Sequence, residues 1–182
     1  DRSVGSYADK GEYLRMRILG IDPGFATIGY GVIDHNGNLN TAVDYGVITT
    51  PKQESIAVRL AMIYDGINEI IARFQPDCVA VEELFFAKNV TTGIHVAHAR
   101  GVILLACVHS CGRLYEYTPL QIKQALTGYG RAQKPQIQQM VKFTLGLEKI
   151  PRPDDAADAL AVALTHSQAT RFGEDFAIKG RI

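Results

Sequence analysis

Hydrophobic positions follow two different periods along this chain, and the change of period marks the secondary structure. Short apolar runs, some of them alternating with polar residues, predict strands. Apolar residues that recur every three or four positions predict helices. The predicted strands span residues 17–22, 29–34, 40–50, 77–82 and 113–117. The predicted helices span residues 55–74, 91–110, 119–127, 134–146 and 154–169.

The order of these elements predicts a single α/β domain. The first three strands form an antiparallel meander, with a hairpin turn at residues 35–38 that we centre on Asn36-Gly37. Helices separate the later strands, which predicts a five-stranded mixed sheet with helices on both faces. Residues 1–15 lack this pattern and are predicted to be a leader or a disordered extension. The domain is predicted to span residues 16–168, followed by a polar C-terminal tail at 169–182.

Composition limits the class of protein. The chain has 182 residues, 47% of them hydrophobic and 21% charged, which excludes a disordered tail and is enough for one real core. No run approaches the roughly 20 apolar residues that would span a bilayer. Cys78, Cys107 and Cys111 lie in apolar surroundings and show no metal-binding or redox spacing. We interpret them as reduced core thiols of a cytoplasmic protein.

Charge is divided unevenly, although 19 basic and 19 acidic residues cancel over the whole chain. Residues 16–87 carry 4 basic and 9 acidic residues, whereas residues 88–149 carry 8 basic and 2 acidic residues. A protein that holds a metal and also binds phosphates would divide its charge in this way. An uneven scatter of solvated surface charges is the alternative explanation.

Four acidic residues occupy positions where a site can form. Asp22 ends the first strand, and Glu82 ends the fourth, which is a nearly continuous apolar run. In open α/β sheets, sites form outside the carboxyl ends of the strands. Asp155 and Asp158 lie three residues apart at the start of the last helix and therefore share one face of it. If this helix covers the ends of the first and fourth strands, the four carboxylates converge.

Convergence of like charges has a chemical consequence. Carboxylates a few Å apart cannot all stay ionised in a partly dry site, so either their pKa values rise or a divalent cation neutralises them. Oxygen ligands without His or Cys favour Mg²⁺ or Mn²⁺. Two such ions about 4 Å apart would activate a water and stabilise the leaving oxygen in an in-line phosphoryl displacement.

Each of these residues also has a structural explanation. Asp22 precedes a Pro-Gly pair and can be a turn former, and Asp154 and Asp155 can cap the last helix. Glu82 and Glu83 are neighbours that face opposite sides of a strand, so one of them points into the site. The apolar pattern of the strand does not decide which one it is.

Four stretches resemble those of the RuvC family of bacterial Holliday junction resolvases, in the RNase H-like/retroviral integrase superfamily. ILGIDPG at 18–24 and AVEELFFAKN at 80–89 resemble the family's first two acidic motifs. KQALTGYGRAQKPQIQQMV at 123–141 resembles its basic DNA-contacting segment, and DDAADALAVALTH at 154–166 resembles its closing helix. The resemblance implies an RNase H-like nuclease domain over residues 16–168.

The resemblance also implies an activity. Members of this family are homodimeric, metal-dependent crossover junction endodeoxyribonucleases, and the helix at 91–110 corresponds to one that contributes to the two-fold interface. They resolve four-way DNA junctions by symmetric paired nicks in recombination and repair, leaving 5′-phosphate and 3′-hydroxyl ends. The resemblance implies Mg²⁺, for which Mn²⁺ can substitute, with two ions per subunit in the active complex. It implies the RuvA–RuvB branch-migration complex as a partner.

The same resemblance assigns roles to individual residues. The expected metal ligands are Asp22, Glu82, Asp155 and Asp158, so the family pattern selects Glu82 over Glu83 and Asp155 over Asp154. Lys134 resembles the family's catalytic lysine, and Lys123 resembles a supporting lysine. Phe85 resembles the aromatic residue that stacks at the junction, and Lys88 a basic residue that contacts DNA.

The loop at 128–134 supports a DNA-binding role on its own chemistry. Its glycines allow movement, and it carries Arg131, Lys134 and an aromatic residue, so it can close over a phosphate backbone. An ordinary surface connection is the bland explanation of the same loop.

Two other functions compete with a nuclease. GIDPG also resembles the start of sugar-kinase-like and actin-like phosphotransferases, but that fold needs two such domains. A junction-binding module without catalysis is the second alternative. Four intact acidic positions weigh against it, because clustered carboxylates cost stability when no metal neutralises them.

Overall fold

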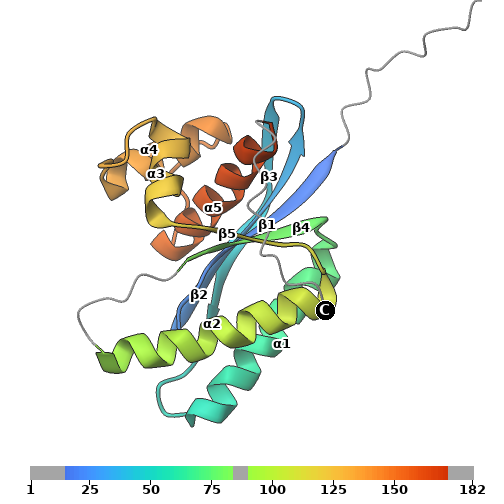
Figure 1. Cartoon of the computed structure of the whole chain (residues 1–182), viewed down its shortest axis with the longest axis vertical. Coiled ribbons are helices and arrows are strands. Elements are labelled where there is room, and N and C mark those ends of the chain that lie inside the picture. Colours follow the sequence, from blue (N-terminus) through green and yellow to red (C-terminus); the bar gives the residue numbers. More distant parts are fainter. Residues whose placement is uncertain (1–14, 84–89, 172–182) are drawn as a thin grey trace, which may run out of the picture.

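The computed structural model describes residues 15–83 and 90–171, which form one mixed sheet with helices on both faces (Figure 1). The strands are β1 (Met16–Asp22), β2 (Thr27–Asn36), β3 (Leu39–Thr49), β4 (Cys78–Glu82) and β5 (Leu114–Tyr117). They lie in the order β3-β2-β1-β4-β5. Pairing is antiparallel between β1, β2 and β3, and parallel from β1 to β4 and from β4 to β5. The predicted meander and five-stranded mixed sheet are confirmed.

The hairpin between β2 and β3 corrects one detail of the prediction. Its loop consists of Gly37 and Asn38, because Asn36 still pairs with Leu39 in the ladder. The predicted Asn36-Gly37 centre was therefore wrong by one residue. Gly37 has a φ of +60°, a conformation that costs glycine little, so the glycine takes the first loop position.

Five helices complete the described part of the chain. They are α1 (Ile56–Phe74), α2 (Val90–Ser110), α3 (Pro119–Thr127), α4 (Lys134–Thr144) and α5 (Asp154–Arg171). The Val58 amide donates to Ser55 Oγ at the start of α1, where the predicted helix begins. Thr118 and Gln121 form a reciprocal capping box at the start of α3. Helix α4 ends two residues earlier than predicted, and α5 continues to Arg171.

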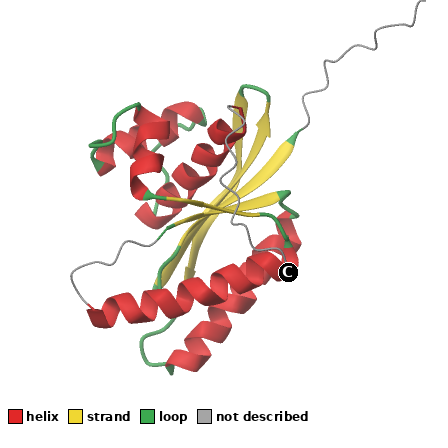
Figure 2. Cartoon of the chain, in the orientation of Figure 1, coloured by secondary structure: helices red, strands yellow, loops and turns green. Residues whose placement is uncertain are grey.

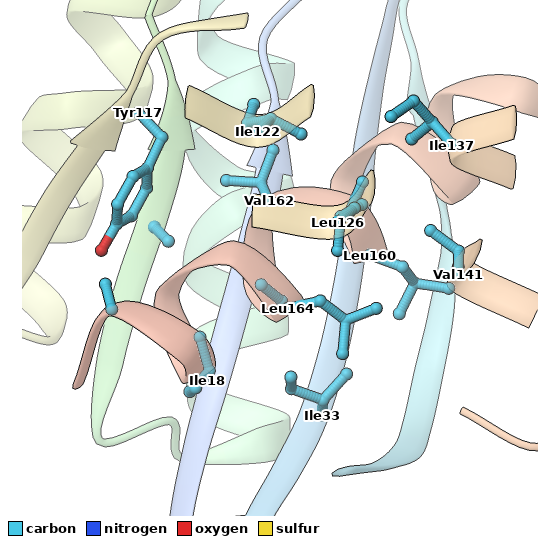
Figure 3. Close-up of a cluster of buried hydrophobic side chains, with 14 of the residues drawn as sticks. Ile18, Ile33, Tyr117, Ile122, Leu126, Ile137, Val141, Leu160, Val162 and Leu164 are labelled. Atoms are coloured by element: carbon cyan, nitrogen blue, oxygen red, sulfur yellow. The ribbon is translucent and has the colours of Figure 1, made fainter. Parts of the chain in front are cut away.

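The helices divide between the two faces of the sheet (Figure 2). Helices α1 and α2 pack on one face with Leu19, Ile21 and the strand residues that share their side. Helices α3, α4 and α5 pack on the other face, where the side chains of Ile18 and Ile33 lie close to those of α5 (Figure 3). Strands β1 and β4 are therefore buried on both faces, which explains their continuous apolar runs.

The state of the cysteines and the apolar length of the helices can be read for residues 15–83 and 90–171. Cys78, Cys107 and Cys111 are free, so no disulfide links them. Burial raises the pKa of Cys78 and of Cys107 to about 12, which keeps both as inert thiols. None of the described helices is long and apolar enough to cross a membrane.

Helix α5 lies directly on the backbone of β1 and β2. A Cβ atom added to Gly20 would be 2.1 Å from the carbonyl oxygen of Ala159, and one added to Gly29 would be 1.9 Å from that of Asp155. Gly20 pairs with Gly31 across the two strands, so glycines line the part of the sheet that α5 contacts. The helix itself presents small side chains and is buried along most of its length. Glycine is required here because any side chain would push the helix off the sheet.

We expect Gly20→Ala to destabilise the protein by about 3 kcal/mol or more, because the clash is with backbone atoms that cannot move independently. Gly66→Ala is the matched control, since its added methyl group would meet the ends of the Ile48 side chain at 3.0 Å or more. Urea unfolding of both variants provides the measurement. Equal stability of Gly20→Ala and the wild type would contradict the close approach of α5.

Candidate nuclease active site

The carboxyl ends of two neighbouring parallel strands place the first two acidic residues. Ile21 pairs with Val81 between β1 and β4, so Asp22 and Glu82 end adjacent strands at the same edge of the sheet. Ile18 and Ala80, which share their strand faces with Asp22 and Glu82, belong to the core beneath α5. Both carboxylates therefore lie on the face that α5 covers.

The first turns of α5 bring the other two carboxylates to this edge. The backbone of Asp155 lies directly over Gly29, which is the cross-strand partner of Asp22. Asp158 follows one turn later on the same side of the helix. The charges of Asp155 and Asp158 both raise the pKa of Asp22, which shows that they lie close to it. The structure thus places all four predicted ligands around one edge of the sheet.

Asp22 and Glu82 are hydrogen-bonded to each other. Burial and the neighbouring charge of Glu82 raise the pKa of Asp22 to about 9. Burial also raises the pKa of Glu82, although its hydrogen bond with Asp22 opposes this rise. At neutral pH the raised pKa of Asp22 corresponds to a proton held between the two carboxyl groups. This pair shares one proton because two carboxylates in contact cannot both be charged.

Lys134 provides the positive charge on the other side of the site. Its Nζ donates to Asp158 Oδ2 at 2.8 Å and lies 3.6 Å from Asp154 Oδ2. The hydrogen bond with Asp158 raises the pKa of Lys134, so the ammonium stays charged. Burial raises the pKa of Asp158 despite this partner. Lys134 begins α4, so the start of that helix is tied to the start of α5.

A pocket of about 330 Å³ opens between these elements. Its charged lining consists of Glu82, Asp158, Lys123 and Lys134. Lys123, from α3, acts on Glu82 and lowers its pKa. The pocket therefore has carboxylates from β4 and α5 and two ammonium groups from α3 and α4. A pocket with carboxylates on one side and ammonium groups on the other suits a substrate that brings a phosphate together with a metal ion.

The structure resolves the two ambiguities that the strand and helix patterns left open. Glu82 lies on the α5 face of β4, whereas Glu83 follows the strand, is exposed, and donates its amide to the Tyr117 carbonyl oxygen. The charge of Asp155 acts on both Asp22 and Asp158, whereas Asp154 pairs with the exposed guanidinium of Arg152 and lies at the edge of the site near Lys134. The placement agrees with the choice that the family pattern made.

The remaining predicted residues have different outcomes. Arg131 is exposed on the loop between α3 and α4, which leads to Lys134. Phe85 and Lys88 lie outside the described residues. Sequence reasoning missed the pairing of Lys134 with Asp154. It also missed that glycines of β1 and β2 let α5 lie directly on the strand backbones. The recurrence of Gly20, Gly29 and Gly31 in the first two strands, together with an alanine-rich last helix, was the signal that could have revealed this contact.

The donor set suits a hard divalent cation. Within residues 15–83 and 90–171, no three acidic, His or Cys side chains are already arranged as a metal cage. Instead a shared proton joins Asp22 and Glu82, and an ammonium neutralises Asp158. A divalent cation can replace both positive partners, because all the available donors are carboxylate oxygens. The residues present therefore fit Mg²⁺ or Mn²⁺.

Comparisons with known proteins identify the family. The family model "Crossover junction endodeoxyribonuclease RuvC" matches residues 18–166. The RuvC protein of Clostridioides difficile is 54% identical over 156 residues, covering 86% of this chain and 92% of its own length. That of Alkaliphilus oremlandii is 54% identical over 164 residues, covering 90% of this chain and 100% of its own length. The chain belongs to the RuvC family.

Solved structures agree with this membership. The Thermus thermophilus RuvC structure is 38% identical, covers 90% of this chain and 100% of that chain, and has a TM-score of 0.83. The same protein in complex with Holliday junction substrate has a TM-score of 0.84. Membership in the RuvC family confirms the predicted RNase H-like fold and the prediction of a crossover junction endodeoxyribonuclease. It argues against the alternative of a sugar-kinase-like or actin-like phosphotransferase.

We expect Asp22→Asn to stabilise the metal-free protein at neutral pH by about 1–3 kcal/mol. The folded-state pKa of Asp22 is raised from 3.8 to about 9, so above pH 4 the unfolded state gains free energy by ionising this group. Asparagine is neutral throughout and removes that cost. Thermal unfolding in EDTA should show a higher Tm for the variant at pH 7 and a smaller difference near pH 4. A lower Tm of the variant at pH 7 would contradict the crowded carboxylates.

Proposed function

We propose that this chain resolves four-way DNA junctions by symmetric paired nicks in homologous recombination and repair, leaving 5′-phosphate and 3′-hydroxyl ends. The observation that carries the proposal is the meeting of Asp22, Glu82, Asp155 and Asp158 beside two lysines. Membership in a family of junction endonucleases supplies the reaction. The family's T. thermophilus member has been solved with a Holliday junction substrate, which supports the choice of DNA.

The four carboxylates would hold Mg²⁺, two ions per subunit in the active complex, with Mn²⁺ as a substitute. Bound there, the metal supplies a Lewis acid that polarises the phosphate and lowers the pKa of the attacking water. On metal binding Asp22 would release to solvent the proton that it shares with Glu82, so that both carboxylates could serve as acceptors. Asp155 and Asp158 are held in place by the rigid first turns of α5. The site thus presents preset oxygen ligands to a charged substrate.

The two lysines have a role in positioning the phosphate. Lys134 is half-exposed and is the first residue of α4. Its ammonium group can therefore exchange its contact with Asp158 for one with a phosphate oxygen. Lys123 faces Glu82 from α3 and adds a second positive charge to the same pocket. Arg131 extends this basic surface along the neighbouring loop. Phe85 and Lys88 remain proposed DNA contacts from the segment that the structure does not describe.

An apolar surface on α1 and α2 supports a homodimer. A groove there is lined by Ile56, Leu60, His98, Val102 and Leu105, with small residues between them. Ile56 and Leu105 are 43% and 50% exposed, which is unusual for large aliphatic residues packed side by side. A two-fold dimer would present one active site to each of two opposed strands of a junction. We further propose the RuvA–RuvB complex as a partner and the cytoplasm as the location.

The direct test is a synthetic four-way junction and a linear duplex of matched sequence. The wild type should nick the junction in pairs with Mg²⁺ and leave the duplex largely intact. Asp155→Asn should lower the cleavage rate at least about a hundredfold and keep junction binding, because one ligand is lost while the phosphate contacts stay. Asp65→Asn, an exposed carboxylate of α1, is the control and should cleave normally. Normal cleavage by Asp155→Asn would refute the site, and equal cutting of the linear duplex would refute the substrate.

We expect Leu105→Lys to disrupt the dimer, because a charge would be buried in the apolar interface. Sedimentation of the wild type should show a dimer, and the variant should sediment as a folded monomer that binds a junction more weakly. A control substitution, Phe143→Lys, alters an equally apolar but separate residue that is 81% exposed on α4. A monomeric wild type, or a dimer that persists in Leu105→Lys, would overturn this interface.

A further inference from the structure

Two polar side chains are hydrogen-bonded to each other in the largely apolar core beneath α5. The hydroxyl of Tyr117 lies 2.7 Å from Nδ1 of His166. Tyr117 is 1% exposed and His166 is 2% exposed. The Tyr115 ring stacks on the imidazole with its centroid 4.1 Å away. Figure 3 shows Tyr117 at one side of this cluster of buried aliphatic residues.

Tyr117 stands where the elements of the active site join. It is the last residue of β5 and pairs with Glu82 of β4 in the parallel ladder. Its carbonyl oxygen accepts from the amide of Glu83 at 2.8 Å. The next residue, Thr118, caps α3, the helix that carries Lys123. Any shift of Tyr117 therefore moves the end of β4 and the start of α3 together.

His166 stands on the helix that carries the other half of the site. It lies two turns after Asp158 on α5, and the residues between them are buried against the sheet. A helix packed in this way moves as one rigid body. The bond from His166 to Tyr117 therefore connects the carboxylates of α5 with the strand end that bears Glu82.

We infer that the hydrogen bond between His166 and Tyr117 is a positioning contact, which sets the separation between the α5 carboxylates and the Glu82 and Lys123 side of the active site. The inference rests on the proposed function, because it concerns the same metal-binding carboxylates. Neither His166 nor Tyr117 is among the proposed metal ligands or the residues that line the pocket, so they are positioning residues and not catalytic ones.

Physical chemistry favours this role over simple packing. An apolar pair of similar shape would fill the same space without the cost of burying two polar groups. Burial lowers the pKa of His166 to about 4, with a smaller contribution from the charge of nearby His35, so the imidazole is neutral at neutral pH. The hydrogen bond between Tyr117 and His166 thus fixes the distance and orientation of β5 relative to α5 without adding net charge. A directional bond fixes the relative placement of two elements that apolar contacts alone would let slide.

The test compares Tyr117→Phe, which removes only the hydroxyl, with Thr165→Val. Thr165 is also buried on α5, and its hydroxyl donates locally to the Ala161 carbonyl oxygen, so its loss does not connect elements of the site. Three quantities are measured on the full chain. They are the single-turnover rate on a four-way junction at saturating Mg²⁺, the junction Kd in Ca²⁺, and the midpoint of the Mg²⁺-dependent rise in Tm without DNA.

We expect Tyr117→Phe to lower the single-turnover rate about tenfold and to raise the Mg²⁺ midpoint by a similar factor, as loss of a contact that orients ligands does. The junction Kd should not change, and Thr165→Val should keep the wild-type rate and midpoint. His166→Asn retains a polar group near the place of Nδ1 and should recover part of the rate that His166→Leu loses. The Tyr117→Phe/His166→Leu double variant should be no slower than His166→Leu, because both changes break one bond.

Two results would overturn the inference while leaving the proposed function intact. One is a wild-type rate and Mg²⁺ midpoint in Tyr117→Phe. The other is a loss of rate in Thr165→Val as large as that in Tyr117→Phe, which would reduce the effect to general stability. A wild-type chain that does not cut the junction at all would overturn the proposed function and this inference with it.

Discussion

Helix α5 lies so close to the sheet that a single methyl group on Gly20 or Gly29 would collide with its backbone. Glycines in β1 and β2 let the helix backbone lie directly on the strand backbones. This contact fixes the height of α5 and hence the position of its first turn. Asp155 is held over the strand neighbour of Asp22 and cannot retreat from the other carboxylates. Larger side chains in place of these glycines would hold α5 farther from the sheet, and Asp155 and Asp158 would then lie farther from Asp22 and Glu82.

Packing energy outweighs the repulsion that this arrangement creates. Two like charges at 4 Å repel by about 4 kcal/mol at an effective dielectric constant of 20. Each fully buried Val or Leu side chain contributes about 1.5–3 kcal/mol, and α5 buries several of them together with its alanines. The fold can therefore afford a crowded site. The proton shared by Asp22 and Glu82 and the ammonium of Lys134 lower the repulsion further.

Sequence patterns were informative wherever one residue type has one dominant physical meaning. The continuous apolar run before Glu82 indicated a strand, and the helical period of the apolar residues indicated a helix from residue 55. The hairpin was misplaced by one residue, because an Asn-Gly pair fits two registers and the ladder decides between them. The choice between Glu82 and Glu83 depended on which face α5 covers, which no local pattern contains. The charge partners of Lys134 also depend on tertiary packing, since Lys134 and Asp158 are 24 residues apart and lie on two separate helices.

We propose that carboxylates from β1, β4 and α5 hold a divalent cation in one place. Anomalous X-ray scattering from crystals grown with Mn²⁺ is the sharpest test, because the peak locates the metal independently of any activity. We expect an anomalous peak bounded by Asp22, Glu82, Asp155 and Asp158. A fully occupied Mn²⁺ site elsewhere on the molecule, with no peak among these four side chains, would contradict it.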